Sequence, residues 1–208
     1  MKITSLAAVA LWSASATCSA QNLVANSDFS NGLQGWTAAP TVLGTITYKA
    51  AAGSPAAGSV ELAVPATQAG SSDAVLSQCI SVVNYPDTNM DFYLRTSTLD
   101  AGVKLNWTLT QIFTGTGCNT NNNPFFLSDT TSGAGMPVAG VGGTWIQRGD
   151  VNSTAISLFP GTKFVLLKIT MSNYNRPGLA GRYFIDHVEF GPTGTTSWPD
   201  TIFVNGFN

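Results

Sequence analysis

The side chains best suited to hold a ligand lie on two stretches of alternating sequence and in one loop. In residues 90–97, Phe92 and Leu94 alternate with Tyr93 and Arg95, so the second pair faces away from the apolar pair. A sugar ring stacks on aromatic side chains and hydrogen-bonds through its hydroxyls to amide and guanidinium groups. The sequence therefore predicts polyol binding. The candidate residues are Tyr93, Arg95, Asn106, Asn173, Tyr174, Asn175 and Arg176.

Catalytic chemistry has little support in the sequence. The only histidine, His187, directly follows Asp186 in an apparent strand, where neighbouring side chains point to opposite faces. Hydrolase elbow, zinc-protease and phosphate-loop motifs are not found in the sequence. Asp91, Asp186 and Glu189 carry the carboxylates that a glycosidase needs, but their spacing selects no pair. We expect a protein that is not an enzyme.

The elements that must position these residues are strands. Apolar residues recur mostly with period two, and no segment keeps a helical period beyond two turns. The pattern predicts an all-β domain, a two-sheet antiparallel β-sandwich in which each strand has one apolar and one polar face. A chain of 208 residues is long enough for one such domain. The expected strands are residues 41–49, 59–64, 74–83, 90–97, 103–113, 163–172 and 182–192, with one or two more in 145–158.

Two terminal stretches are expected to pair with each other. The opening stretch NLVANSDFSNGLQGW, residues 22–36, reads as a short edge strand, a turn at residues 30–32 and a buried anchor, Trp36. Its expected partner is RYFIDHVEFGP, residues 182–192. Between the inner strands, residues 114–144 are rich in Gly, Asn, Thr and Ser and predict a long loop.

Residues 1–20 have the pattern of a signal peptide. Lys2 precedes an apolar run, and small residues lead to a cleavage site after Ala20. A lipoprotein signal acylated at Cys18 is the weaker alternative. We expect a protein that is secreted or at the cell surface, in an extracellular or periplasmic compartment, with no transmembrane segment. In such a compartment Cys79 and Cys118 are expected to form a disulfide.

The charge of the chain argues against a nucleic-acid partner. Lys and Arg total 9 against 11 Asp and Glu, and charged residues make up only 10% of the chain. No basic cluster of the kind that binds phosphates is present in the sequence.

Three motifs in order resemble carbohydrate-binding modules of the CenC type. The opening stretch is similar to that family's N-terminal signature, which is built around Asn-Gly-Asp-Phe and ends in Gly-x-x-x-Trp. AVLSQCISV, the following strand with Tyr93 and Arg95, and the turn at Cys118 resemble its second third. FIDHVEF resembles its closing strand, usually Phe-Asp-Asp-Val. The resemblance covers residues 21–191 and implies a galactose-binding-like jelly roll.

The same resemblance implies a structural calcium ion, for which Asp28 and Asp186 are the metal-ligand candidates. The sequence departs from the family at Ser27 and Ser30, and His187 replaces an aspartate. Gly and Glu are commoner at the positions of Ser27 and Ser30, and this first departure weakens the calcium assignment, because it removes a carboxylate of the kind that calcium favours. The alternative is that Asp28 caps its own turn and Asp186 satisfies buried backbone donors.

The sequence thus predicts three segments and one main function. Residues 1–20 are a signal peptide, 21–191 a carbohydrate-binding-like module, and 192–208 a C-terminal tail that serves as a sorting or docking tag or as an extra edge strand. The expected function is non-catalytic binding of carbohydrate or another cell-surface polymer through one sheet face and adjoining loops. The alternative is a structural or adhesive surface protein with a protein partner.

Overall fold

The computed structural model describes the strands and most of their connections. The backbone alone is described for residues 99–101, 126–129, 146–150 and 156. The expected signal segment 1–20, the tail beyond Thr193, and the loop candidates Tyr174, Asn175 and Arg176 lie outside the described residues. The described residues are 21–40, 43–53, 57–66, 73–86, 88–101, 103, 105–118, 126–129, 145–150, 156–173 and 178–193.

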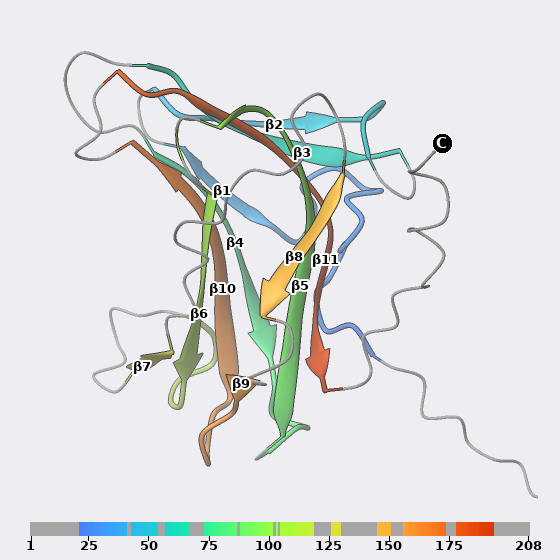
Figure 1. The fold of residues 1–208 in the computed structure, drawn as a ribbon. Helices are drawn as coiled ribbons and strands as arrows, with labels where there is room; N and C mark the ends of the chain where they lie inside the picture. Colours follow the sequence, from blue (N-terminus) through green and yellow to red (C-terminus); the bar gives the residue numbers. More distant parts are fainter. Residues whose placement is uncertain are drawn as a thin grey trace, which may run out of the picture.

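Two antiparallel sheets pack face to face, which confirms the predicted all-β sandwich. Sheet A has the order β1-β4-β10-β6-β7, and sheet B has the order β2-β3-β11-β5-β8, with the short β9 also pairing with β5. In Figure 1, β6 and β10 stand on the left and β5 and β11 on the right. The strands are β1 Thr37–Pro40, β2 Thr45–Lys49, β3 Ser59–Val64, β4 Asp73–Ser81, β5 Asn89–Ala101, β6 Leu105–Ile112, β7 Phe126–Asp129, β8 Ile146–Asp150, β9 Ile156–Ser157, β10 Phe164–Ser172 and β11 Gly181–Pro192.

The core lies between the sheets and follows the predicted alternation. Every second residue of β4, β6 and β10 is buried, and the residues between them are mostly half-exposed. Trp107 of sheet A is 2% exposed, and its ring centroid lies 5.8 Å from that of Phe92 in sheet B. Aromatic pairs at this distance join the two layers by area burial and by ring-to-ring contact.

The opening stretch ties the two sheets together at one end of the sandwich. The Leu23 N–H donates to the Phe190 carbonyl, and the Val188 N–H donates to the Ser27 carbonyl. These bonds confirm the predicted pairing with β11. On the other side, the Gln78 amide of β4 accepts from the Ala25 N–H at 2.8 Å and donates to the Ala25 carbonyl at 2.9 Å.

The expected edge strand in this stretch is wrong, because residues 21–36 form turns and irregular chain. Asn26 and Phe29 have φ angles of 49° and 53°, which interrupt an extended chain. The Asn26 amide donates to the carbonyls of Gly32 and Gln34, and its oxygen accepts from the Asn31 N–H. The predicted turn at residues 30–32 and the buried Trp36 are confirmed, with Trp36 packed 5.3 Å from the Phe29 ring.

Most other strands form close to their predicted places. The prediction for residues 59–64 matches β3 fully, and the predictions for 90–97 and 163–172 match β5 and β10 within a few residues. Two short strands were not predicted. β1 has the sequence TAAP, and β7 lies inside the stretch that was predicted as a loop. β1 pairs with β4, and β7 pairs with β6. Backbone hydrogen bonds to these longer strands hold the two short strands, which their own sequences do not predict.

The predicted disulfide joins Cys79 and Cys118 and is confirmed. Cys79 is an exposed, outward-facing residue of β4, whereas residue 118 follows β6, on the far side of β10 from β4. We call residues 113–118 the strap. To reach Cys79, the strap must pass over β10, near the start of that strand, on the outer side of sheet A. The bridge closes a loop with a sequence separation of 39.

Candidate functional site

The predicted ligand residues lie on two different faces of the sandwich. Tyr93 and Arg95 are on β5 and point away from the core on sheet B, because Phe92 and Leu94, with which they alternate, are core residues. Asn106 points outward from β6 on sheet A. One ligand site on a single sheet face therefore cannot contain Asn106 together with the other two residues. Alternation fixes whether a residue faces the core, but it does not say to which sheet its strand belongs.

The outer face of sheet A is half-exposed and mostly uncharged. Its central strands are β4, β10 and β6, and three register rows of outward side chains cross all three strands, with Asp73 and Ser172 beyond them at one end and Ser81 and Phe164 at the other. The rows are Cys79, Leu166 and Thr110; Ser77, Lys168 and Thr108; and Val75, Thr170 and Asn106. Lys168 is the one charged side chain among these nine described residues. Hydroxyl, amide and ammonium groups thus share one accessible surface, which we call the A face.

The two ends of the A face differ. At one end the strap reaches Cys79 and stands beside the row of Leu166 and Thr110. At the other end Asn173 follows β10, but it is 1% exposed and its amide donates to the Pro65 carbonyl at 3.2 Å. Asn173 therefore holds a neighbouring loop, and its burial leaves it little surface for a ligand.

The outer face of sheet B carries buried charges around Arg95. Arg95 is 4% exposed and is the register partner of Asp186 across β5 and β11. Burial lowers the pKa of the Arg95 guanidinium, while the negative charges of Asp186 and Glu189 act in the opposite direction. Asp186 and Glu189 are themselves buried. The three groups form a desolvated ion cluster of the kind that is costly to disrupt.

A bulge in β11 brings His187 into this cluster. The register against β5 shifts between Asp186 and Glu189, and His187 has a φ of 47°. Its ring Nε2 lies 2.7 Å from Glu189 Oε1, and its backbone N–H donates to Asp186 Oδ1 at 2.7 Å. Alternation separates His187 from its neighbour Asp186 but puts residues i and i+2 on one face, so the contact with Glu189 could have been expected from the spacing. The bulge, which sequence reasoning missed, lets the charges of Asp186 and Glu189 both act on Arg95 although they are three residues apart.

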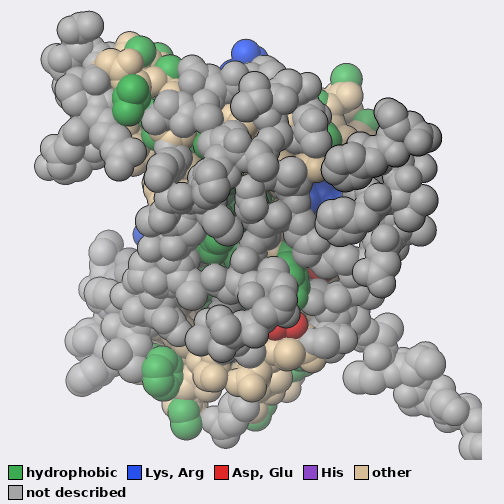
Figure 2. All heavy atoms as spheres, in the orientation of Figure 1, with side chains coloured by type: hydrophobic (Ala, Val, Ile, Leu, Met, Phe, Trp, Pro, Cys, Tyr) green, Lys and Arg blue, Asp and Glu red, His purple; other side chains and the backbone are tan. Residues whose placement is uncertain are grey.

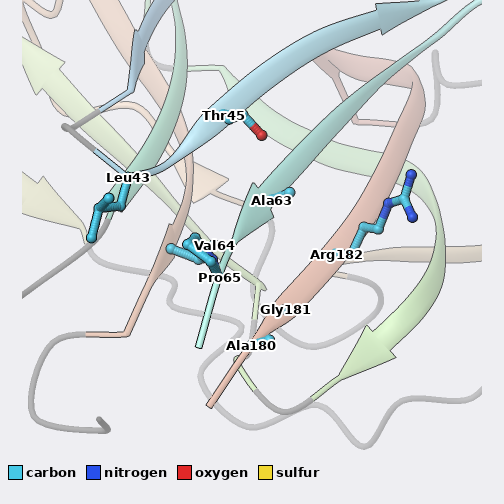
Figure 3. Close-up of a pocket in the computed structure, with 8 residues that line it drawn as sticks. All are labelled: Leu43, Thr45, Ala63, Val64, Pro65, Ala180, Gly181 and Arg182. Atoms are coloured by element: carbon cyan, nitrogen blue, oxygen red, sulfur yellow. The ribbon is translucent and has the colours of Figure 1, made fainter. Parts of the chain in front are cut away.

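A second charged group on sheet B stands beside a pocket. Arg182 Nη2 lies 2.7 Å from Glu61 Oε2, and Lys49 Nζ lies 3.5 Å from Glu61 Oε1. The pocket has a volume of about 440 Å³ at one end of β2, β3 and β11. Figure 3 shows Ala63 between Thr45 and Arg182 in this hollow. It is lined by Leu43, Thr45, Ala63, Val64, Pro65, Ala180, Gly181 and Arg182.

The two metal-ligand candidates each accept a hydrogen bond from nearby backbone. Asp28 Oδ1 accepts from the Ser30 N–H at 3.2 Å, and Asp186 Oδ1 accepts from the His187 N–H. Both contacts fit the capping alternative. Among the described residues, no group of three or more His, Cys, Asp or Glu side chains is placed to hold a metal ion. These side chains alone do not make up the several oxygen ligands that calcium takes, and the calcium ion stays a prediction.

The pKa of Asp28 is lowered by its turn. Partial burial alone would raise this pKa. Hydrogen bonds from the Ser30 backbone and side chain and from the Asp28 N–H, together with the nearby His187, lower it by more than burial raises it. The charged form of Asp28 is therefore the form that the folded turn stabilises.

Charges are sparse on the surface as well. On the face drawn in Figure 2, the described Lys, Arg, Asp and Glu side chains occur singly, without a broad patch of one sign. No helix in the described part of the chain is long and apolar enough to cross a membrane.

The fold is similar to that of several solved carbohydrate-binding modules. TmCBM61, solved in complex with β-1,4-galactotriose, shares 14% identity and a TM-score of 0.52, with 83% of this chain and 99% of that chain covered. A carbohydrate-binding module from the β-sandwich superfamily, described as promiscuous in specificity, shares 16% identity and a TM-score of 0.55, with 78% and 60% covered. At these identities the likeness establishes the fold.

Another similar structure is part of an enzyme. The enzymatically active domain of tailspike protein 4 from bacteriophage CBA120 shares 16% identity and a TM-score of 0.52; the match covers 82% of this chain but only 21% of that one. No protein-family model matches this chain, and no curated protein matches it. The resemblance to the CenC type stays a resemblance, while the β-sandwich fold is shared with carbohydrate-binding modules.

Proposed function

We propose that this protein is a secreted, non-catalytic module that binds carbohydrate on the A face. The observation that carries the proposal is the register row of Ser77, Lys168 and Thr108, three half-exposed polar side chains on adjacent strands. The neighbouring row adds Asn106 and Thr170. Together these side chains offer hydroxyl, amide and ammonium groups to a ligand that lies across the strands.

This chemistry suits a neutral sugar polymer. Sugar hydroxyls both donate and accept hydrogen bonds, as do the Thr, Ser and Asn side chains of the A face. Adjacent strands are about 4.8 Å apart, so donors on three strands can follow successive groups of an extended chain. The strap gives one side of this surface a raised border held by the disulfide.

The buried charges of sheet B support the choice of face. Arg95, Asp186 and Glu189 have little solvent-accessible surface with which to contact a polymer. Tyr93 has the same intermediate exposure as Ser77, Thr108 and Lys168, but it stands next to the buried Arg95. We therefore assign Arg95 to the stability of sheet B, place Tyr93 with it outside the sugar site, and retain Asn106 from the predicted set.

Solved structures with this fold include a module bound to a galactotriose, which supports a carbohydrate ligand. The CenC-type resemblance and the expected signal peptide support export to a compartment where polysaccharides occur. The tailspike domain keeps an enzymatic role open by fold alone, but fold does not determine chemistry.

A protein partner is the second candidate, and one observation favours it. All four residues of β1, an edge strand of sheet A, are exposed. An exposed edge can accept a strand from another chain by backbone pairing. Pro40 at the end of β1 limits the length of such a pairing, because proline cannot donate to the ladder.

Affinity electrophoresis of the protein lacking residues 1–20 tests the proposal. Gels containing β-1,4-galactan, xylan, mixed-linkage β-glucan or galactomannan are compared with a gel without polymer. We expect retardation in at least one gel, and we expect the double variant Asn106→Ala with Thr108→Ala to weaken it. Thr47→Ala, on the exposed outer side of β2, is the matched control. Equal retardation of the double variant and the control would exclude the A face.

A further inference from the structure

The pocket beside Arg182 is lined by small apolar residues, such as Ala63 and Pro65, and by the polar side chains of Thr45 and Arg182. Thr45, Ala63 and Arg182 are register partners on three adjacent strands, and the methyl of Ala63 stands between two longer side chains. This difference in size leaves the hollow seen in Figure 3. Its volume of about 440 Å³ lies within the range of ~300–1,000 Å³ that small-molecule sites occupy.

Two glycines allow the backbone on both sides of this pocket to pack closely against the sandwich. A Cβ on Gly44 would overlap the carbonyl of Asp73, and a Cβ on Gly181 would lie 2.6 Å from Met171 Cε. The chain beside Leu43 is therefore pressed onto the start of β4, and the start of β11 is pressed onto the core. Both sides of the pocket are fixed by backbone packing.

The Arg182 side chain is held in place by contacts within the protein, without a ligand. Arg182 Nε donates to Glu61 Oε2 at 2.8 Å, and the guanidinium lies 5.9 Å from the centroid of the Phe184 ring. The side chain is nevertheless 46% exposed. A guanidinium has five N–H donors, so those not used by Glu61 remain for a ligand. A fixed donor costs less conformational entropy on binding than a free one.

The described cations beside the pocket already have a carboxylate partner, which favours a neutral ligand. Lys49 and Arg182 both form ion pairs with Glu61. A pyranose ring fits better than a charged ligand, because one of its faces is apolar and its hydroxyls both donate and accept.

We propose that this pocket is a second carbohydrate site, which takes one neutral pyranose unit. Ala63, Pro65 and Leu43 contact the C–H face of the ring, and Arg182 and Thr45 hydrogen-bond its hydroxyls. The pocket opens on sheet B, on the opposite side of the sandwich from the A face. Resting on the proposed function of the A face, the consequence is that one molecule bridges two polysaccharide chains.

Matched variants separate the pocket from the ion pairs beside it. Arg182→Gln removes a pocket donor and one cation from Glu61, whereas Lys49→Gln removes the other cation without touching the pocket lining. Ala63→Leu fills the hollow with a larger side chain. Urea unfolding of each variant verifies that it is folded, and Arg182→Gln keeps the test decisive should Ala63→Leu fail to fold.

The test combines affinity electrophoresis in the four polysaccharide gels with light scattering of the same polymers in solution. We expect the wild type to bind and to increase the size of the scattering particles by bridging. Arg182→Gln, Ala63→Leu and the A-face double variant should each abolish bridging and weaken retardation at least about tenfold, because avidity from two sites is lost. Lys49→Gln should behave as wild type.

Each remaining outcome decides between the two sites. Wild-type behaviour of Arg182→Gln or of folded Ala63→Leu would overturn the pocket, and an equal loss in Lys49→Gln would overturn Arg182 as a contact. Loss in the pocket variants with no loss in the A-face variant would keep the pocket and overturn the proposed A face. No retardation of the wild type in any gel would overturn both.

Discussion

The two outer faces of this sandwich use polar residues in opposite ways. On sheet A, side chains such as Thr108 and Lys168 are half-exposed and nearly uncharged as a group. On sheet B, the charged groups of Arg95, Asp186 and Glu189 are buried, and the two carboxylates act on the Arg95 charge. The comparison teaches that the most polar-looking stretch of a β-sandwich can be structural, while a plain row of hydroxyls and an amine remains available to a ligand.

The largest effect that this comparison predicts is on stability. Arg95→Met should lower the free energy of unfolding by about 3–5 kcal/mol, because it removes the guanidinium charge that opposes the two buried carboxylates of Asp186 and Glu189. Lys168→Met on the A face is the matched control and should change it by less than about 0.5 kcal/mol. Urea denaturation measures both. Equal losses of stability in the two variants would contradict the difference between the two faces, because a polar residue of the A face would then matter to stability as much as Arg95 does.

Removal of the disulfide should have the next largest effect. Replacing Cys79 and Cys118 with serine opens the loop that the bridge closes, and the expected loss of stability is about 2–4 kcal/mol. The strap would also lose its position beside Leu166, so retardation by a polysaccharide gel should weaken. Thermal unfolding and affinity electrophoresis of the double variant measure the two effects. Unchanged retardation would show that the strap does not border the ligand.

A smaller effect is expected from acid at Asp28. Because its folded pKa lies below the ordinary value of 3.8, Asp28 contributes stability that is present above its unfolded pKa and is lost as pH falls through the folded one. The melting temperature of Asp28→Asn should therefore lie below that of the wild type at neutral pH. The two melting temperatures should converge as the pH falls through the folded pKa of Asp28. A constant difference from neutral to acidic pH would contradict the assignment.

The smallest expected effect is that of a chelator. If Asp28 and Asp186 act only as acceptors for the N–H groups of Ser30 and His187, then EDTA should leave the melting temperature unchanged. A lower melting temperature in EDTA, restored by calcium, would instead support the implied calcium ion, because a ligand that binds only the folded state raises its stability.

The sequence predicts the strands well where both faces of a strand have a clear character. Val60, Leu62 and Val64 alternate with polar or small residues, and β3 has the bounds expected from them. β7 was missed because its four residues lie in a stretch rich in Gly, Asn and Thr. Its position depends on pairing with β6, a long-range contact that local propensity does not contain.

The candidate site was less predictable for two physical reasons. Alternation placed Tyr93 and Asn106 outward but could not reveal that their strands belong to opposite sheets. Period-two reasoning also failed at the β11 bulge, which lets the charges of Asp186 and Glu189, three residues apart, both act on Arg95. The pocket depends on Ala63 being the smallest of three register partners, and this register is visible only in the folded sheet.

The most direct test of the central claim is a ¹H–¹⁵N NMR titration with an oligosaccharide prepared from whichever polysaccharide retards the protein. We predict that the amide signals of Ser77, Thr108 and Lys168 shift together and saturate with one apparent affinity. The amide signals of Tyr93 and Arg95 should not shift. Shifts at Tyr93 and Arg95 with none in the Ser77, Thr108 and Lys168 row would contradict the account, because the Tyr93 and Arg95 side of β5 would then carry the sugar and the A face would not.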